Sequence, residues 1–244
     1  MRIKAVCKYK GTRYFGWQKQ VNEITVQSCI LEALNKILNE DINIYASGRT
    51  DAGVHALGQV FHFDLDKQVD LDKLKYSLNC VLPSDISIVS LSEVDQEFHA
   101  RFSARSKRYR YIISLNEKDP INYELEYNCL YHTDMKKFVK TIELFKGKQN
   151  FKNFTSKEED EDNFIREIYK IDVNVKDNKI IVDIFGNGFM RYMIRNIVGT
   201  SLAVAWGKED ISYIKNKLNP ESERIISPYK APPQGLYLVE VNYK

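Results

Sequence analysis

Apolar and polar residues alternate at the start of the chain. Between residues 2 and 9 the apolar side chains fall on one side and most charged ones on the other, which predicts a strand with one exposed face. The apolar spacing then becomes helical, and Thr25 precedes it as an N-cap, so a helix is expected over 26–37. The next expected elements are a strand over 42–46, a loop over 48–53, a strand over 59–65, a helix capped by Asp70 and a strand over 86–94.

A second series of elements repeats this order. It comprises a strand over 107–115, a helix over 134–145, a hairpin of strands 168–175 and 179–185, helices over 189–206 and 210–218, and a strand over 236–243. The first series follows the order β-α-β-β-α-β, which is that of a ferredoxin-like fold. The second repeats this order, with two consecutive helices before its last strand. The segment 157–163 is acidic and is expected to form a mobile surface loop.

The sequence therefore predicts an α+β protein made of two fused ferredoxin-like halves, residues 1–105 and 106–244. Two such halves can join edge to edge into one extended, mainly antiparallel sheet with helices on one face. The opposite face would then hold a central cleft where the halves meet, which is a common location for a ligand.

Charge is distributed unevenly along the chain. The formal net charge of +3 is too small to indicate a partner by itself. Basic residues nevertheless gather in three stretches without any acid, at residues 1–22, 99–110 and 184–208. Each stretch alone is typical of an ordinary solvated face, but the three together favour a surface that binds a polyanion.

The four cysteines are scattered, and no CxxC pair occurs. This pattern indicates neither a disulfide framework nor a zinc site, and it is typical of reduced thiols in the cytoplasm. The N-terminus lacks the apolar core of a signal peptide, and no apolar run approaches the length of a membrane span. A cytoplasmic location is therefore expected.

The segment GRTDAGVHA, residues 48–56, is the first candidate for chemistry. Its glycines allow a tight loop that presents Asp51, and Arg49 lies on the same side of an extended chain, where it can keep the carboxylate ionised. Asp51 would then serve as a nucleophile or base. A solvated aspartate in a turn explains the spacing equally well. A metal site of Asp51 and His55, with His62 or His99, is a weaker alternative, because no Cys/His or carboxylate cluster accompanies it.

The segment HARFSARSKRYRY, residues 99–111, interleaves aromatic and cationic side chains. In the expected strand Tyr109 and Tyr111 share one face, and Arg108 and Arg110 share the other. Aromatic rings stack on unpaired RNA bases and guanidinium groups hold phosphates, so the pattern fits RNA binding. It also fits a half-buried strand whose tyrosines pack in the core.

The segment GNGFMRYMIRNIVG, residues 186–199, places Arg191 and Arg195 four residues apart. On a helix both would share one face, beside an apolar stripe and without an acid nearby. A core helix explains the stripe but does not require the arginines, which a nucleic-acid phosphate would use.

Together these segments resemble the tRNA pseudouridine synthase A family along the whole chain, and GRTDAGVH is a highly specific signature. Further matching segments are GTRYFGWQ (11–18), TVQ (25–27), GQV (58–60) and APPQGLY (231–237). The resemblance implies an isomerase that converts uridine to pseudouridine in the anticodon stem-loop, at tRNA positions 38–40, without metal or cofactor. It also implies a homodimer that binds tRNA across both subunits, in a basic cleft between the halves of each.

The resemblance also assigns roles to individual residues. Asp51 falls at the catalytic aspartate and Tyr109 at the active-site tyrosine, and Arg49 and Arg195 match positions expected to hold Asp51. The residues expected to contact RNA are Lys10, Arg13, Arg101, Lys107, Arg108, Arg110 and Arg191.

Three segments depart from the family pattern: Lys10 replaces the usual aspartate, residues 226–230 replace a small glycine-containing stretch, and the stretch after Phe151 is atypical. These departures bear on tRNA docking and on the choice of uridine. Two rival functions remain open from the residues alone. One is a non-catalytic RNA-binding module, and the other is a metal-dependent hydrolase.

Overall fold

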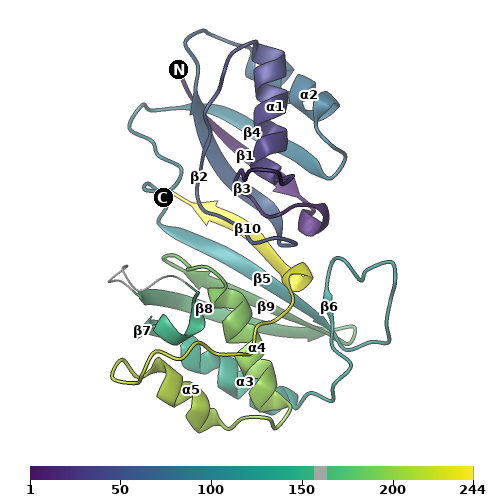
Figure 1. The fold of residues 1–244 in the computed structure, drawn as a ribbon, viewed down its shortest axis with the longest axis vertical. Coiled ribbons are helices and arrows are strands. Elements are labelled where there is room, and N and C mark those ends of the chain that lie inside the picture. The colour runs from purple at the N-terminus through teal and green to yellow at the C-terminus, as the bar shows by residue number, and fades with distance from the viewer. Residues whose placement is uncertain (157–163, 244) are drawn as a thin grey trace. The chain divides into compact units, whose positions relative to one another are not determined.

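The structure, a computed structural model, describes residues 1–156 and 164–243. The chain forms two compact units (Figure 1), the first comprising Met1–Arg105 with Tyr237–Lys244 and the second Ser106–Leu236. The α+β class and the mainly antiparallel pairing expected from the sequence are confirmed. The expected loop over 157–163 lies outside the described residues.

The first unit contains a sheet with helices packed on one face. Its elements are β1 (Arg2–Tyr9), α1 (Val26–Leu38), β2 (Tyr45–Ala46), β3 (His55–Asp64), α2 (Leu71–Val81) and β4 (Ile86–Val94), joined by β10 (Leu236–Asn242). Strand β1 pairs antiparallel with both β3 and β4. The apolar side of β1 is buried, with Ile3, Ala5 and Cys7 in the core, as its alternating pattern predicts.

The helices of the first unit begin where side chains cap them. Thr25 and Ser28 form a capping box, in which Thr25 Oγ1 accepts from the Ser28 backbone N–H and Ser28 Oγ accepts from the Thr25 backbone N–H. At α2 the Asp70 carboxylate accepts from the backbone N–H groups of Asp72 and Lys73. Both helix starts were therefore readable from single polar residues.

Strand β3 shares one of its edges between two partners. Its end pairs antiparallel with β2, through Tyr45 opposite His62, whereas its beginning pairs parallel with β10, through Tyr237 opposite His55. The strand over 236–243 was expected to belong to the second half, residues 106–244. In the structure Tyr237–Lys244 belongs to the first compact unit, because backbone hydrogen bonds join β10 to β3.

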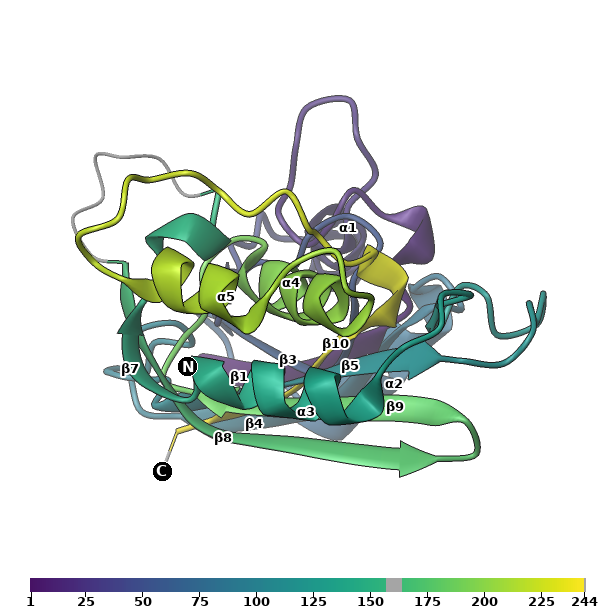
Figure 2. The same cartoon turned by 90° about the horizontal axis from the view of Figure 1, so that it is seen from below.

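The second unit contains a sheet in the order β5-β9-β8-β7, with β6 paired to β5. Its elements are β5 (Ser106–Ser114), β6 (Tyr127–Asn128), α3 (Met135–Ile142), β7 (Gly147–Asn150), β8 (Ile165–Lys176), β9 (Lys179–Gly186), α4 (Met193–Ala205) and α5 (Ile211–Leu218). The three helices lie on one side of β8 and β9 (Figure 2). Every residue of α4 is buried, which makes this helix the centre of the unit's core.

Two expected helices of the second unit are shorter than predicted. The helix expected over 134–145 ends as α-helix at Ile142 and continues as one turn of 3-10 helix. The helix expected from residue 189 begins only at Met193, because Tyr192 adopts a left-handed backbone conformation with φ 63°. Arg191 therefore precedes α4, and the prediction that it shares a helix face with Arg195 is wrong.

Candidate active site

The loop that carries Asp51 joins β2 to β3 and is fixed at its base by Gln59. The fully buried Gln59 side chain donates through Nε2 to the carbonyl oxygen of Gly48 at 2.9 Å and accepts from Ser47 Oγ at 2.8 Å. The Ser47 backbone N–H donates to the carbonyl of Val60 at 2.7 Å. The start of the loop is thus tied to the middle of β3 by three hydrogen bonds.

The tip of the loop is held by the segment 11–18. The Trp17 backbone N–H donates to the carbonyl oxygen of Thr50 at 3.1 Å, and the Gly53 N–H donates to the carbonyl of Tyr14 at 3.3 Å. The Trp17 side chain is itself buried and lies 5.8 Å, centroid to centroid, from the ring of Phe61. The segment 11–18, distant in sequence, is therefore hydrogen-bonded to the backbone on both sides of Asp51.

Close approach of the two segments requires a glycine at position 16. Gly16 has φ +85°, and a Cβ atom there would lie 2.5 Å from the carbonyl oxygen of Thr50 and 3.1 Å from the carbonyl carbon of Asp51. Any other residue would have to push the loop away while adopting a left-handed backbone. Sequence reasoning noted this segment only as a matching motif. No local pattern signals that it supports Asp51.

Two buried polar side chains complete the support of the loop. The Tyr9 hydroxyl and Thr50 Oγ1 share a buried hydrogen bond of 2.9 Å, and His55 Nδ1 accepts from the Gly11 backbone N–H at 2.9 Å. Asp51 itself is partly exposed, and its carbonyl oxygen accepts from the Val54 N–H at 3.1 Å. Asp51 therefore projects from a loop whose backbone is hydrogen-bonded both to β3 and to the segment 11–18.

Arg49 lies on the exposed side of the same loop. Its Nε donates to Oε1 of Gln18 at 3.2 Å, so the segment 11–18 holds this guanidinium as well as the loop backbone. The spacing predicted an ion pair between Arg49 and Asp51. The contact described for Arg49 is instead this bond to a neutral amide.

Tyr109 and Arg195 belong to the second unit. Tyr109 lies on β5, largely buried, with its ring edge-to-face against Phe189 at 5.2 Å. Arg195 lies in the first turn of α4, also largely buried, and its Nε donates to the carbonyl oxygen of Ala231 at 2.8 Å. Tyr111, two residues after Tyr109, is fully buried and donates to the carbonyl of Pro232 at 2.6 Å, so it anchors the core.

Two of the arginines expected to contact RNA are engaged in ion pairs. Arg110 forms a two-pronged pair with Asp183 on β9, at 3.0 and 2.8 Å, because the two residues lie opposite each other in the strand register. Arg13 pairs with Asp85 at 2.8 Å. These carboxylates neutralise both guanidinium groups, which favours a structural role for them.

The remaining expected RNA contacts lie at accessible positions. Arg101 and Arg191 are exposed, whereas Lys10, Lys107 and Arg108 are half-buried. The guanidinium of Arg101 lies over the ring of its neighbour Phe102, with 5.7 Å between Cζ and the ring centroid.

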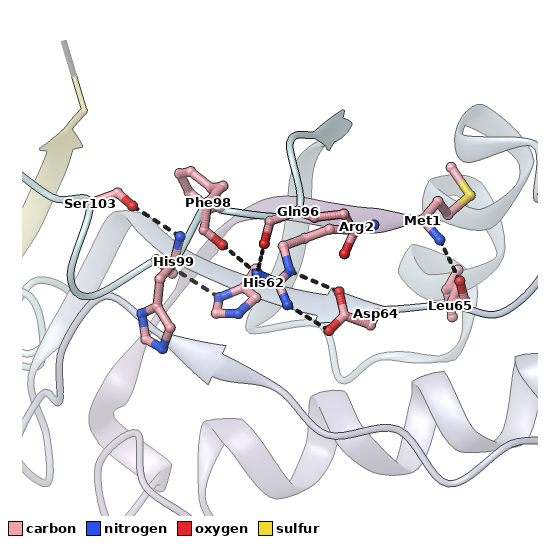
Figure 3. A network of polar contacts seen from close by, with 10 residues as sticks. Met1, Arg2, His62, Asp64, Leu65, Gln96, Phe98, His99 and Ser103 are labelled. Carbon is pink, nitrogen blue, oxygen red and sulfur yellow. Dashed lines mark hydrogen bonds and ion pairs between the residues drawn. The ribbon is translucent and has the colours of Figure 1, made fainter.

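Arg101 is presented by a tight turn that His99 organises. His99 Nδ1 accepts from the backbone N–H groups of Arg101 and Phe102. The His99 N–H donates to Ser103 Oγ at 3.0 Å (Figure 3). The ring of His62 packs edge-on against that of His99, and burial, with help from His99 and Arg2, lowers the pKa of His62 to about 4. Both histidines thus serve as neutral hydrogen-bond acceptors in this turn.

The histidines considered as metal ligands have other partners. His55 Nδ1 is occupied by the Gly11 N–H, and His62 Nδ1 accepts from the Ala100 N–H at 3.1 Å. Within residues 1–156 and 164–243, no three His, Cys, Asp or Glu side chains gather as a metal site requires. Nor does any helix of these residues have the length and apolarity needed to cross a membrane.

Comparison with known proteins identifies the family. A family model described as tRNA pseudouridine synthase matches residues 5–103 and 141–244. The chain is 42% identical to tRNA pseudouridine synthase A of Geobacillus sp. (strain WCH70), over 99% of this chain and 98% of the relative. It is 40% identical to that of Ruminiclostridium cellulolyticum and 38% identical to that of Thermoanaerobacter sp. (strain X514), over 99% of both chains in each case.

Among solved structures, a chain from the crystal structure of a Cbf5-Nop10-Gar1 complex aligns with 12% identity and a TM-score of 0.36, over 82% of this chain and 54% of the other. That likeness is too weak to support an argument. The family match and the full-length relatives are sufficient: the chain belongs to the tRNA pseudouridine synthase family and is an isomerase that converts uridine to pseudouridine in tRNA.

Proposed function

We propose that Asp51 is the catalytic residue and that the enzyme acts on uridines of the anticodon stem-loop, at tRNA positions 38–40. The observation that carries the assignment of Asp51 is the double support of its loop, by Gln59 from β3 and by Trp17 from the segment 11–18. An enzyme benefits from such rigidity where a reacting group must be held in position, because misplacement by about 1 Å can reduce the rate about a hundredfold.

The reaction defines what the carboxylate must do. The N1–C1′ bond of uridine breaks, the uracil turns, C5 bonds to C1′, C5 loses a proton and N1 gains one, so the atoms balance without any redox step. Bond cleavage leaves positive charge near C1′, as in glycoside hydrolysis, and an ionised carboxylate there stabilises the charge or attacks covalently. The target base must first leave its stack to reach such a group. The scheme requires neither metal nor cofactor.

Three further residues support this proposal. Tyr109 is largely buried on β5, where its ring can stack on the extruded base and its hydroxyl can assist removal of the C5 proton. We assign Arg195 to holding Asp51 in its ionised form. Arg49, whose guanidinium donates to Gln18, is assigned to stabilising the loop that carries Asp51. Lys10, Arg101, Lys107, Arg108 and Arg191 supply positive charge for the RNA backbone.

We also propose that the enzyme acts as a homodimer, each tRNA contacting both subunits. Sedimentation equilibrium of the free protein and of its tRNA complex tests this assembly. A dimer in both samples supports it, and a monomeric complex at saturating tRNA contradicts it.

The function is tested with tRNA transcripts tritiated at uridine C5, incubated with enzyme and EDTA. Release of tritium, followed by mapping of pseudouridine to positions 38–40, is the expected result. Asp51→Asn is expected to abolish release while binding tRNA as the wild type does. Asp66→Asn, which removes an exposed carboxylate of the same unit, is the matched control and should remain active. Modification confined to another arm of the tRNA would contradict the proposed target.

A further inference from the structure

Tyr192 adopts a backbone conformation that a tyrosine rarely takes. Its φ and ψ of 63° and −2° lie in the left-handed region, where it forms the N-cap of α4 without a capping side-chain bond. Glycine and asparagine occupy this region with little strain, whereas a bulky residue adopts it at a cost. The fold retains a strained residue where its side chain provides something that glycine does not.

The Tyr192 ring is surrounded by three cations. Lys230 Nζ lies 4.3 Å from the ring centroid, and the guanidinium carbons of Arg191 and Arg195 lie 4.8 and 5.3 Å from it. Arg191 also donates through its NH2 group to the Tyr192 hydroxyl at 3.0 Å. The negative face of an aromatic ring attracts cations, so the ring holds together three groups that repel one another.

The position of Lys230 relative to this ring is fixed by its own backbone neighbours. The Ala231 N–H donates to the carbonyl oxygen of Arg195 at 3.0 Å, and Arg195 Nε donates back to the carbonyl of Ala231. Three residues before Lys230, Ser227 shares a buried hydrogen bond of 2.7 Å with Thr200 of α4. The atypical stretch 226–230 is therefore hydrogen-bonded to α4 near both ends, and these bonds position Lys230 beside the Tyr192 ring.

The charges of Arg191 and Lys230 are not balanced by acids of the described chain. Arg191 and Lys230 are exposed, and within residues 1–156 and 164–243 neither side chain has a carboxylate within ion-pair distance. Arg110, by contrast, has a carboxylate partner. Two adjacent exposed cations held on a rigid ring are suited to a phosphate group, which accepts hydrogen bonds from both.

We propose that Tyr192, Arg191 and Lys230 form a phosphate-binding site for the backbone of the substrate tRNA, with Tyr192 as its scaffold. This inference rests on the proposed function for its RNA ligand. It adds to the site two residues, Tyr192 and Lys230, that the family resemblance does not assign. It also gives a role to residues 226–230, which depart from the family pattern, because this stretch contains Lys230.

The site is tested by measuring tRNA affinity against KCl concentration for Arg191→Gln, Lys230→Gln and the control Lys136→Gln, an exposed lysine on α3. Loss of one phosphate contact should reduce the slope of log K against log salt by about 0.9, which weakens binding about eightfold at 0.1 M salt. The control should keep the wild-type slope. Wild-type slopes for both site variants would overturn the proposal.

Substitution of Tyr192 distinguishes its role in positioning the two cations from any role in the stability of the fold. Tyr192→Gly relieves the left-handed strain and removes the ring, so the melting temperature should be kept while the salt slope falls. Tyr192→Phe should retain most of the affinity, because it keeps the ring. A Tyr192→Gly variant that binds tRNA with wild-type affinity and slope would contradict the scaffold role. These binding measurements are independent of tritium release. Failure of the wild type to release tritium would overturn the proposed function. Unchanged salt slopes of tRNA binding in the variants would overturn only this phosphate site.

Discussion

The support of the Asp51 loop by the segment 11–18 makes Gly16→Ala an informative perturbation. The variant must hold alanine at φ +85°, which costs about 1–2 kcal/mol in the left-handed region. Its Cβ would begin 2.5 Å from the Thr50 carbonyl oxygen. Real Cβ contacts rarely fall below about 3.0–3.4 Å, so the loop must retreat by roughly 0.5–0.9 Å, a displacement that we expect to reduce the rate about 10- to 100-fold.

The assay is single-turnover tritium release with enzyme in excess over tRNA, accompanied by thermal unfolding. Gly207→Ala is the matched control, because Gly207 has φ +74° and, among the described residues, nothing lies within 4 Å of the place that an alanine Cβ would take. Both variants should lose about 2–8 °C of melting temperature from the backbone cost, and Gly16→Ala more because of the contact. Only Gly16→Ala should lose turnover.

Two results would refute this reasoning. Wild-type turnover in Gly16→Ala, with the expected loss of stability, would mean that the loop position does not control the reaction. An equal loss of turnover in Gly207→Ala would mean that general destabilisation, rather than displacement of Asp51, slows the enzyme.

Three further outcomes are expected. Tyr9→Phe should lower the free energy of unfolding by about 1–3 kcal/mol in urea titrations, because the buried Thr50 hydroxyl loses its partner; an unchanged midpoint would contradict this. Burial lowers the pKa of His62 to about 4, so the unfolded chain binds more protons below pH 6.5, and the melting temperature should fall as the pH drops from 6.5 towards 4. His62→Asn should flatten that pH dependence and the exposed His132→Asn should not. Arg110→Gln should lower stability by about 0.5–1 kcal/mol and leave the salt slope of tRNA binding unchanged, whereas a smaller slope would return Arg110 to the RNA-contacting residues.

Most elements of the fold were predictable because single residues signal them. Alternation marked β1, and the side chains of Thr25 and Asp70 marked the starts of two helices. The start of α4 was not predictable, because the helical spacing runs on through Tyr192, whose left-handed backbone stops the helix. Helical periodicity reports which face is buried and carries no information about such a local reversal.

The sequence predicted Asp51 as the centre of the candidate site, but it did not predict most of the contacts that hold the Asp51 loop. The sequence placed Asp51 in a glycine-bounded loop. It did not reveal that Gln59 holds this loop through its side-chain amide, or that Trp17 holds it through a backbone N–H, because both bonds form only when the chain folds. The interleaving of aromatic and cationic residues in the segment 99–111 likewise selected Arg110 as an RNA contact. It could not detect Asp183, which meets Arg110 only when β5 and β9 pair in register.

The chemical role of Asp51 is tested by single-turnover tritium release from Asp51→Asn with the tRNA fully bound. Saturation removes any effect of affinity from the measured rate, and the melting temperature reports on the fold. We expect no release above background, with tRNA affinity and melting temperature near those of the wild type. Release at a substantial fraction of the wild-type rate would contradict it and would require another residue to act on the uridine.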